Sequence, residues 1–103
     1  MAAPLVVTIP HQLGKEEAHR RVKGLMSQVT ASVPMISVQR EIWTQDQLDF
    51  ELKALGQVTS GLIDVGESNV RIEIILPLML RTLGAALQRA LESRGKLLLE
   101  KKP

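Results

Sequence analysis

The sequence contains no cysteine and almost no aromatic residues. Its 103 residues include one tryptophan, one phenylalanine and no tyrosine. Without cysteine, the chain cannot form a disulfide, use a thiol nucleophile or bind zinc through thiolates. The few aromatic side chains also leave little on which nucleic-acid bases could stack. These absences exclude thiol chemistry and argue against a nucleic-acid platform.

Long apolar runs and a strong charge of one sign are missing as well. No run approaches the roughly 18 apolar residues of a spanning helix, and the N-terminal MAAPLVVTIP lacks the basic and long apolar regions of a signal peptide. The formal net charge of +2 is too small to indicate a nucleic-acid partner. We therefore expect a cytoplasmic protein with no transmembrane segment and no nucleic-acid partner. Because 45% of the residues are hydrophobic, one small globular domain is predicted.

The period of the apolar residues changes along the chain, and the change predicts the fold. A period of two predicts strands with one buried face, over residues 5–9, 35–43, 48–54, 57–65 and 70–76. A period near 3.6 predicts helices over residues 14–33 and from Pro77 to Gly95. The predicted fold is α+β, with one antiparallel-rich sheet and two helices on one face in the order β-α-β-β-β-β-α. It would be TBP-like, or like half of a helix-grip fold.

Four details of this prediction can be checked directly. We expect a β-bulge near Gly61, because the apolar parity changes along that strand. Leu83 and Leu87 should be buried on Val70, Ile72 and Ile74. Ile36, Val38 and Ile42 should point inward, and the outer face should carry polar residues, namely Ser37, Gln39, Glu41, Asp49, Glu51, Lys53, Arg71 and Glu73. Residues 1–95 should form the domain, and residues 96–103 a basic, leucine-containing tail.

The sequence offers no catalytic, cofactor-binding or metal-binding site. The two histidines, His11 and His19, are not four apart on one helix face, as a helical metal pair would be. The predicted surface contact is the tail, through Leu97, Leu98, Leu99, Lys96, Lys101 and Lys102. The same leucines could instead belong to a frayed helix end or to the edge of the core. Trp43 either packs on the core or adds to the contact surface.

Three segments resemble one protein family in their order and spacing. They are Ile9–Ala18 (IPHQLGKEEA), Ser60–Val65 (SGLIDV) and Val70–Leu87 (VRIEIILPLMLRTLGAAL). Together they resemble the polyhydroxyalkanoic acid system protein family, the polyhydroxyalkanoate granule-associated region. The resemblance implies a small bacterial cytoplasmic protein that is an accessory of storage granules and not an enzyme. It also implies structural roles for His11, through backbone hydrogen bonds, and for Gly14, through an unusual backbone angle.

The partners that this resemblance implies are the polymer granule surface or granule proteins. A different function stays open beside it, which is the binding of a lipid or another hydrophobic ligand. The chain is too short to enclose a large cavity alone, so this second function would require a homodimer joined through edge strands.

Overall fold

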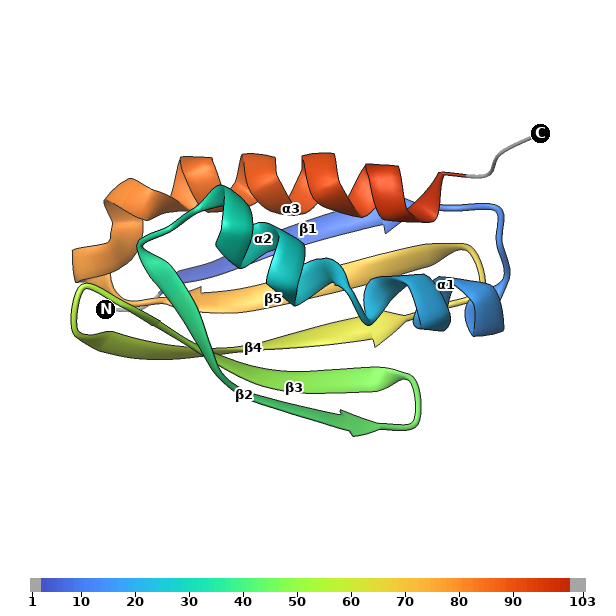
Figure 1. The fold of residues 1–103 in the computed structure, drawn as a ribbon, viewed down its shortest axis with the longest axis horizontal. Helices are drawn as coiled ribbons and strands as arrows, with labels where there is room; N and C mark the ends of the chain where they lie inside the picture. The colour runs from blue at the N-terminus through green and yellow to red at the C-terminus, as the bar shows by residue number, and fades with distance from the viewer. Residues whose placement is uncertain (1–2, 101–103) are drawn as a thin grey trace.

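Five antiparallel strands form one sheet in the computed structural model, which describes residues 3–100 (Figure 1). The sheet order is β1-β5-β4-β3-β2, so each strand from β2 to β5 lies beside its sequence neighbour and β1 joins at the β5 edge. The α+β prediction is therefore confirmed. The strands are β1 (Ala3–Pro10), β2 (Ile36–Thr44), β3 (Gln47–Ala54), β4 (Gln57–Val65) and β5 (Asn69–Leu76).

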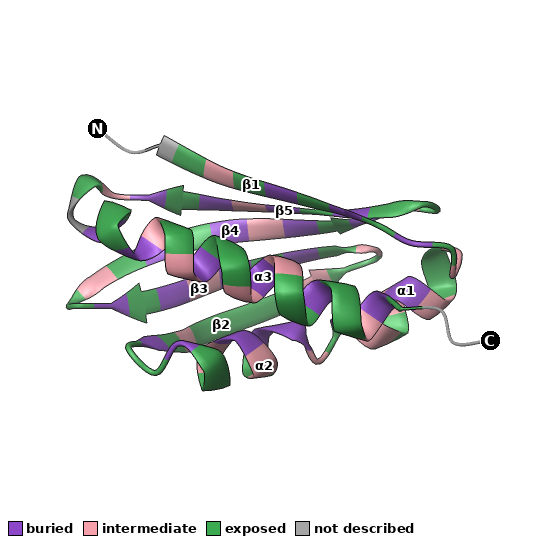
Figure 2. Cartoon of the chain, turned by 90° about the horizontal axis from the view of Figure 1, so that it is seen from above, coloured by how far each residue is buried: buried purple, intermediate pink, exposed green. Residues whose placement is uncertain are grey.

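The helices cover one face of this sheet, as Figures 1 and 2 show. They are α1 (Lys15–Val22), α2 (Leu25–Ser32), the 3-10 helix η1 (Leu78–Leu83) and α3 (Gly84–Leu99). The first predicted helix is thus two helices. The helix is interrupted at Lys23 and Gly24, where the Gly24 N–H donates to the Arg21 carbonyl at 3.3 Å. Glycine is a poor helix residue, so the break falls where helical stability is lowest.

The last helix differs from its prediction at both ends. Pro77 precedes a 3-10 segment of six residues and not the first turn of an α-helix. At the other end α3 does not stop at Gly95 but continues to Leu99. Gly95 is buried, and a Cβ added there would collide with the Ile9 side chain. The glycine therefore leaves room for the Ile9 side chain where α3 packs on β1, and it does not end the helix.

The core lies between the sheet and the helices, and Figure 2 shows it as a buried stripe along α3 and alternate strand positions. Leu83 and Leu87 are buried, as predicted. The predicted inward residues of β3 and β5 are also buried, namely Leu48, Phe50, Leu52, Ala54, Val70, Ile72, Ile74 and Leu76. Within residues 3–100, no helix is long and apolar enough to cross a bilayer.

The β-bulge prediction was wrong in its position. β4 pairs with β3 and β5 without interruption through Gly61, whereas the register shifts in β2 between Val38 and Arg40. Gly61 lies opposite Phe50, and the Phe50 ring occupies the space that a side chain at Gly61 would need. The alternation of buried and exposed positions therefore continues through Gly61 in β4, and the Phe50 ring fills the space above the glycine.

The shift in β2 reverses the faces of the residues that follow it. Ile42, predicted to point inward, is 49% exposed and pairs with Asp49. Glu41, predicted on the outer face, pairs instead with Phe50 and so shares the helix-covered face. Arg40 takes the outer position, where its guanidinium lies 3.6 Å from the Glu51 carboxylate. The outer face thus carries Arg40 in place of Glu41, and beside the predicted polar residues it also exposes the apolar side chains of Val6, Ile42, Val58 and Ile75.

Candidate functional site

The C-terminal leucines do not lie on one surface. Leu97 is exposed and Leu98 is half-buried, whereas Leu99 is part of the core. Lys96 is exposed beside Leu97, and Lys101 and Lys102 lie outside the described residues. A contact surface in this region would therefore use Leu97 and Lys96 and not Leu99.

The end of α3 is bound to α1 through one arginine. The Arg21 guanidinium donates to the carbonyl oxygens of Leu98 (3.3 Å) and Glu100 (2.7 Å), which satisfies acceptors that a helix end leaves open. The Glu17 carboxylate holds Arg21 in place at 2.7 Å and also accepts hydrogen bonds from Arg20. The hydrogen bonds from Arg20 and Arg21 lower the pKa of Glu17. Residues 98–100 are thus attached to the folded domain.

Trp43 belongs to a cluster that joins α1 to the β2–β3 hairpin. Its ring is half-buried and stacks on His19 with centroids 4.4 Å apart. His19 Nδ1 lies 2.9 Å from Asp46 Oδ1, and the Lys15 ammonium lies 3.8 Å from the other oxygen of Asp46. The burial of Trp43 favours a packing role, although part of its ring still faces solvent.

This cluster borders an open cleft of about 600 Å³ with charges of both signs. Its lining residues are Lys15, Glu16, His19, Arg20, Lys23, Asp46 and Glu67. A His–Asp pair can transfer protons. However, none of these lining residues is a serine, threonine or cysteine, and residues 3–100 contain no group of three His, Asp or Glu side chains placed to hold a metal. What the contacts of His19 and Lys15 show is that this cluster connects α1 to the β2–β3 hairpin.

A different end of the molecule displays large apolar side chains to solvent. Five such residues in the described part of the chain are more than half exposed. One of them is Leu97, and the other four lie in turns, near the start of β4 or at the start of η1, all at the end of the sheet where η1 follows β5. We call these four the apolar end: Met35 (52%), Leu55 (59%), Val58 (55%) and Leu78 (60%).

Leu55 occupies an unusual backbone position within the apolar end. Ala54 pairs with Gln57, so Leu55 and Gly56 form a two-residue hairpin loop, with φ of 52° and 78°. This loop geometry favours asparagine or aspartate followed by glycine. A leucine in the left-handed region costs roughly 1–2 kcal/mol, and its exposed side chain adds nothing to the core.

The family of the chain is shown by a sequence match over almost its whole length. Residues 5–99 match the sequence profile of a family described as "Putative polyhydroxyalkanoic acid system protein". The chain belongs to this family. The match begins in β1 and ends at the last residue of α3, so it covers every helix and strand. The family description connects the protein with polyhydroxyalkanoates and names no reaction. No curated protein matches the sequence.

In this member of the polyhydroxyalkanoic acid system family, the motif residues support the fold. His11 is buried, with Nε2 3.0 Å from the Gly66 carbonyl oxygen, while the Leu13 N–H donates to Nδ1 at 3.2 Å. Both ring nitrogens are therefore engaged, which leaves neither for a metal. Gly14 has φ of 80°, as its proposed role requires. Gly61 makes room for Phe50.

The apolar end was not predicted from the sequence of this family member. Its four residues lie at positions 35, 55, 58 and 78, and no local period relates them. The one available signal was the dipeptide Leu55-Gly56 in a short hairpin loop, where a polar residue normally precedes the glycine.

Proposed function

We propose that the protein is a cytoplasmic, non-catalytic accessory of polyhydroxyalkanoate granules that acts by binding the granule surface or granule proteins. The observation that carries this proposal is the family match over residues 5–99. The geometry of the histidines supports it, because His11 is engaged by backbone groups and His19 is engaged by Asp46 and Trp43. The cleft beside His19 is lined by no serine, threonine or cysteine, and residues 3–100 contain no group of three side chains placed to hold a metal.

Two surfaces are available for such binding. The first is the exposed pair Lys96 and Leu97 near the end of α3, which joins one apolar side chain to one cation. Lys101 and Lys102 extend this basic composition in the sequence. The second is the apolar end, at the other end of the molecule. A single leucine provides little apolar area, so the first surface would need support from neighbouring residues or from a second copy.

The proposal is tested in cells that accumulate polymer. A fluorescent protein fused after Pro103 should be diffuse when the cells store no polymer and should move onto granules when they do. The same fusion partner expressed alone should stay diffuse under both conditions. A fusion that stays diffuse while granules form would contradict the proposal.

A homodimer that binds a lipid or another hydrophobic ligand is the second candidate, and one feature of β2 favours it. β2 is an edge strand of nine residues, with pairing partners on one side only. Beside it, an open groove of about 440 Å³ lies between α2 and β2, lined by Ser27, Thr30, Ala31, Ile36, Ser37, Val38 and Glu41. Light scattering of the purified protein would measure a dimeric mass, and mass spectrometry would identify a co-purified lipid. A lipid-free monomer would contradict this candidate.

A further inference from the structure

We propose that the apolar end, defined by Met35, Leu55, Val58 and Leu78, is the surface that lies against the aliphatic polyester of the granule. This inference rests on the proposed granule association and adds to it the contact surface and the chemistry of its partner. Three independent observations support it: the position of the four side chains, the backbone conformation of Leu55 and the distribution of charge.

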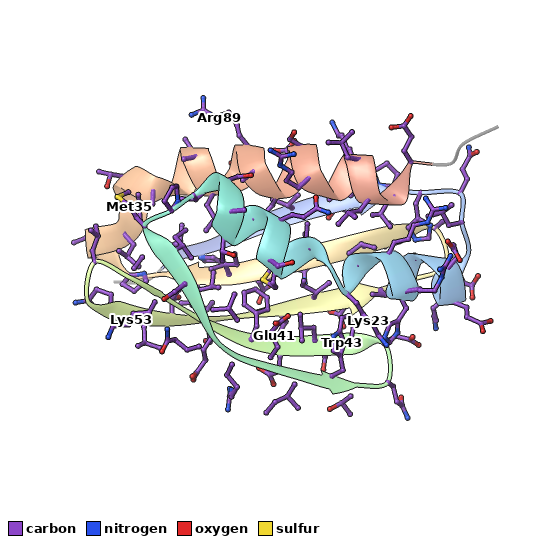
Figure 3. The ribbon with its side chains drawn as sticks, viewed as in Figure 1. Lys23, Met35, Glu41, Trp43, Lys53 and Arg89 are labelled. Carbon is purple, nitrogen blue, oxygen red and sulfur yellow. The ribbon has the colours of Figure 1, made fainter. Side chains whose placement is uncertain are left out.

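The four residues converge because their elements end at the same place. Ile36 pairs with Ala54, so Met35, which precedes Ile36, and Leu55, which follows Ala54, lie beyond the same end of the β2–β3 pair. Val58 pairs with Lys53 one step from the same hairpin loop. Leu78 begins η1, and Leu80 of η1 lines a small internal cavity together with Ile36, Ala54 and Thr59. Figure 3 shows Met35 and Lys53 at this end of the molecule. The four exposed apolar side chains therefore lie at one tip of the molecule, where a large surface could meet them at once.

The conformation of Leu55 gives the patch a functional meaning. A non-glycine residue with positive φ is uncommon and persists only where the surrounding structure enforces it. Asparagine would fit this loop position with less strain and would keep a polar group in water. The fold instead presents a leucine whose side chain is mostly exposed. A residue that lowers stability and adds nothing to the core is explained by contact with a partner.

The charges around the apolar end match an aliphatic polyester. Residues 33–38, 53–60 and 74–88 contain no aspartate or glutamate, and they include Lys53 and Arg81, both exposed. A polymer of hydroxy acids presents an aliphatic surface with ester groups, and each chain ends in one carboxylate. The apolar side chains suit the surface, and the two cations suit the carboxylates. The opposite end carries Lys15, Glu16 and Asp46 around the charged cleft, and these charged side chains are better solvated by water than by an aliphatic surface.

The shape of the molecule allows the two ends to act separately. Its extents are 41 × 25 × 21 Å, so the molecule is elongated along one axis. Figure 1 shows the strands running along this axis, with η1 and the β3–β4 turn at one end and α1 at the other. A protein standing on its apolar end would bury the four side chains and keep the charged cleft away from the polymer.

Two leucines of nearly equal exposure allow a matched test. Leu55→Asn removes an apolar side chain from the apolar end, and Leu97→Gln removes one from the C-terminal surface; the wild-type side chains are 59% and 57% exposed. Each purified protein is mixed with protein-free poly(3-hydroxybutyrate) particles, and the bound fraction is measured after sedimentation over a concentration series. We expect Leu55→Asn to weaken binding about tenfold, which corresponds to losing part of one leucine's burial. Leu97→Gln should lose clearly less affinity than Leu55→Asn, because a single leucine at the C-terminal surface provides little apolar area.

The melting temperature separates a lost contact from a damaged fold. Leu55→Asn should melt at the same temperature as the wild type or higher, because asparagine relieves the strain at this φ. Weaker binding together with undiminished stability supports the contact surface. Leu78→Gln provides a second variant, in a different element, with the same expected loss of binding.

Three outcomes would overturn the inference. The first is that Leu55→Asn and Leu78→Gln both bind the particles as tightly as the wild type. The second is that Leu97→Gln loses as much affinity as they do. The third is that the wild type binds vesicles of anionic phosphatidylglycerol and not polyester particles. In cells, a wild-type fusion that stays off granules contradicts the proposed function itself, whereas a Leu55→Asn fusion that localises like the wild type contradicts only this contact surface.

Discussion

Gly61 offers the sharpest test of how the sheet and its core fit together. A Cβ added at Gly61 would overlap Cζ of Phe50 and lie 2.6 Å from the Glu73 carbonyl oxygen. Phe50 is fully buried at the centre of the core, and the Glu73 oxygen belongs to the backbone of the neighbouring strand. Neither neighbour moves easily, so Gly61→Ala should destabilise the protein although alanine is usually the better strand residue.

The size of the effect follows from two opposing terms. Overpacking a core typically costs about 1–3 kcal/mol, and replacing a strand glycine with alanine returns roughly 0.5–1 kcal/mol. Because one of the two clashes is with backbone, we take the upper part of the first range and expect a net loss of about 2 kcal/mol. This is a large share of the roughly 5–15 kcal/mol that stabilises a typical domain.

Urea denaturation followed by circular dichroism measures this loss directly. The transition midpoint should fall while the slope stays unchanged, because the surface exposed on unfolding is the same. Ser60→Ala, at the exposed neighbouring position, is the matched control and should change stability by less than about 0.5 kcal/mol.

A double-mutant cycle with Phe50→Leu identifies the clash as the cause. Leucine lacks the ring atoms that would meet the new Cβ, so the double variant should be more stable than the sum of the single losses predicts. If Gly61→Ala is as stable as the wild type, or if the two changes are simply additive, the explanation of Gly61 by the Phe50 ring is wrong.

Three further variants test the packing at other points. Leu87→Ala, at a position 2% exposed on α3, should lower the free energy of unfolding by about 2–5 kcal/mol, and a loss below about 0.5 kcal/mol by chemical denaturation would contradict the orientation of α3. Gly95→Ala should lower the melting temperature, although alanine favours helices, because its Cβ would collide with Ile9; a higher melting temperature would refute that contact. Thr59→Val should stabilise the protein by about 1 kcal/mol, because the Thr59 hydroxyl is buried without a hydrogen-bond partner, and a lower urea midpoint would mean that the hydroxyl is in fact bonded.

The sequence predicted strands well where apolar and polar residues alternate for a single reason, the burial of one sheet face. β3 and β5 alternate strictly because one face is covered by helices and the other is not. In β4 the pattern has three exceptions: Val58 is apolar but exposed, Thr59 is polar but buried, and Gly61 has no side chain but faces the core. The rule that apolar residues point inward therefore suggested a bulge, because the filling of the Gly61 position by Phe50 depends on a different strand.

The other errors also come from interactions between segments. The register shift in β2 is marked by no glycine or proline, so nothing local distinguished Glu41 from Arg40 as the outward residue. The apolar arc of residues 14–33 continues past Gly24, which hid the break between α1 and α2. The end of α3 depends on Arg21, whose contacts with Leu98 and Glu100 span more than 70 residues.

The candidate sites were predictable only in part for the same reason. The composition of residues 96–103 indicated a basic, leucine-containing segment, but the burial of Leu99 follows from how α3 lies on the sheet. The apolar end brings together residues that lie up to 43 positions apart in the sequence, so only the assembled fold reveals it.

The antiparallel pairing of β1 with β5 has a practical consequence for anyone who labels this protein. Ala3 pairs with Leu76, two residues before η1 begins at Leu78, so β1 starts next to the apolar end. The last described residues lie at the opposite end, beside Arg21, and Figure 1 shows the start of β1 and the end of α3 far apart along the long axis. A bulky N-terminal tag would therefore shield the apolar end from any large surface. A tag at the C-terminus would leave that end open, so the two fusions report on different faces of the same molecule.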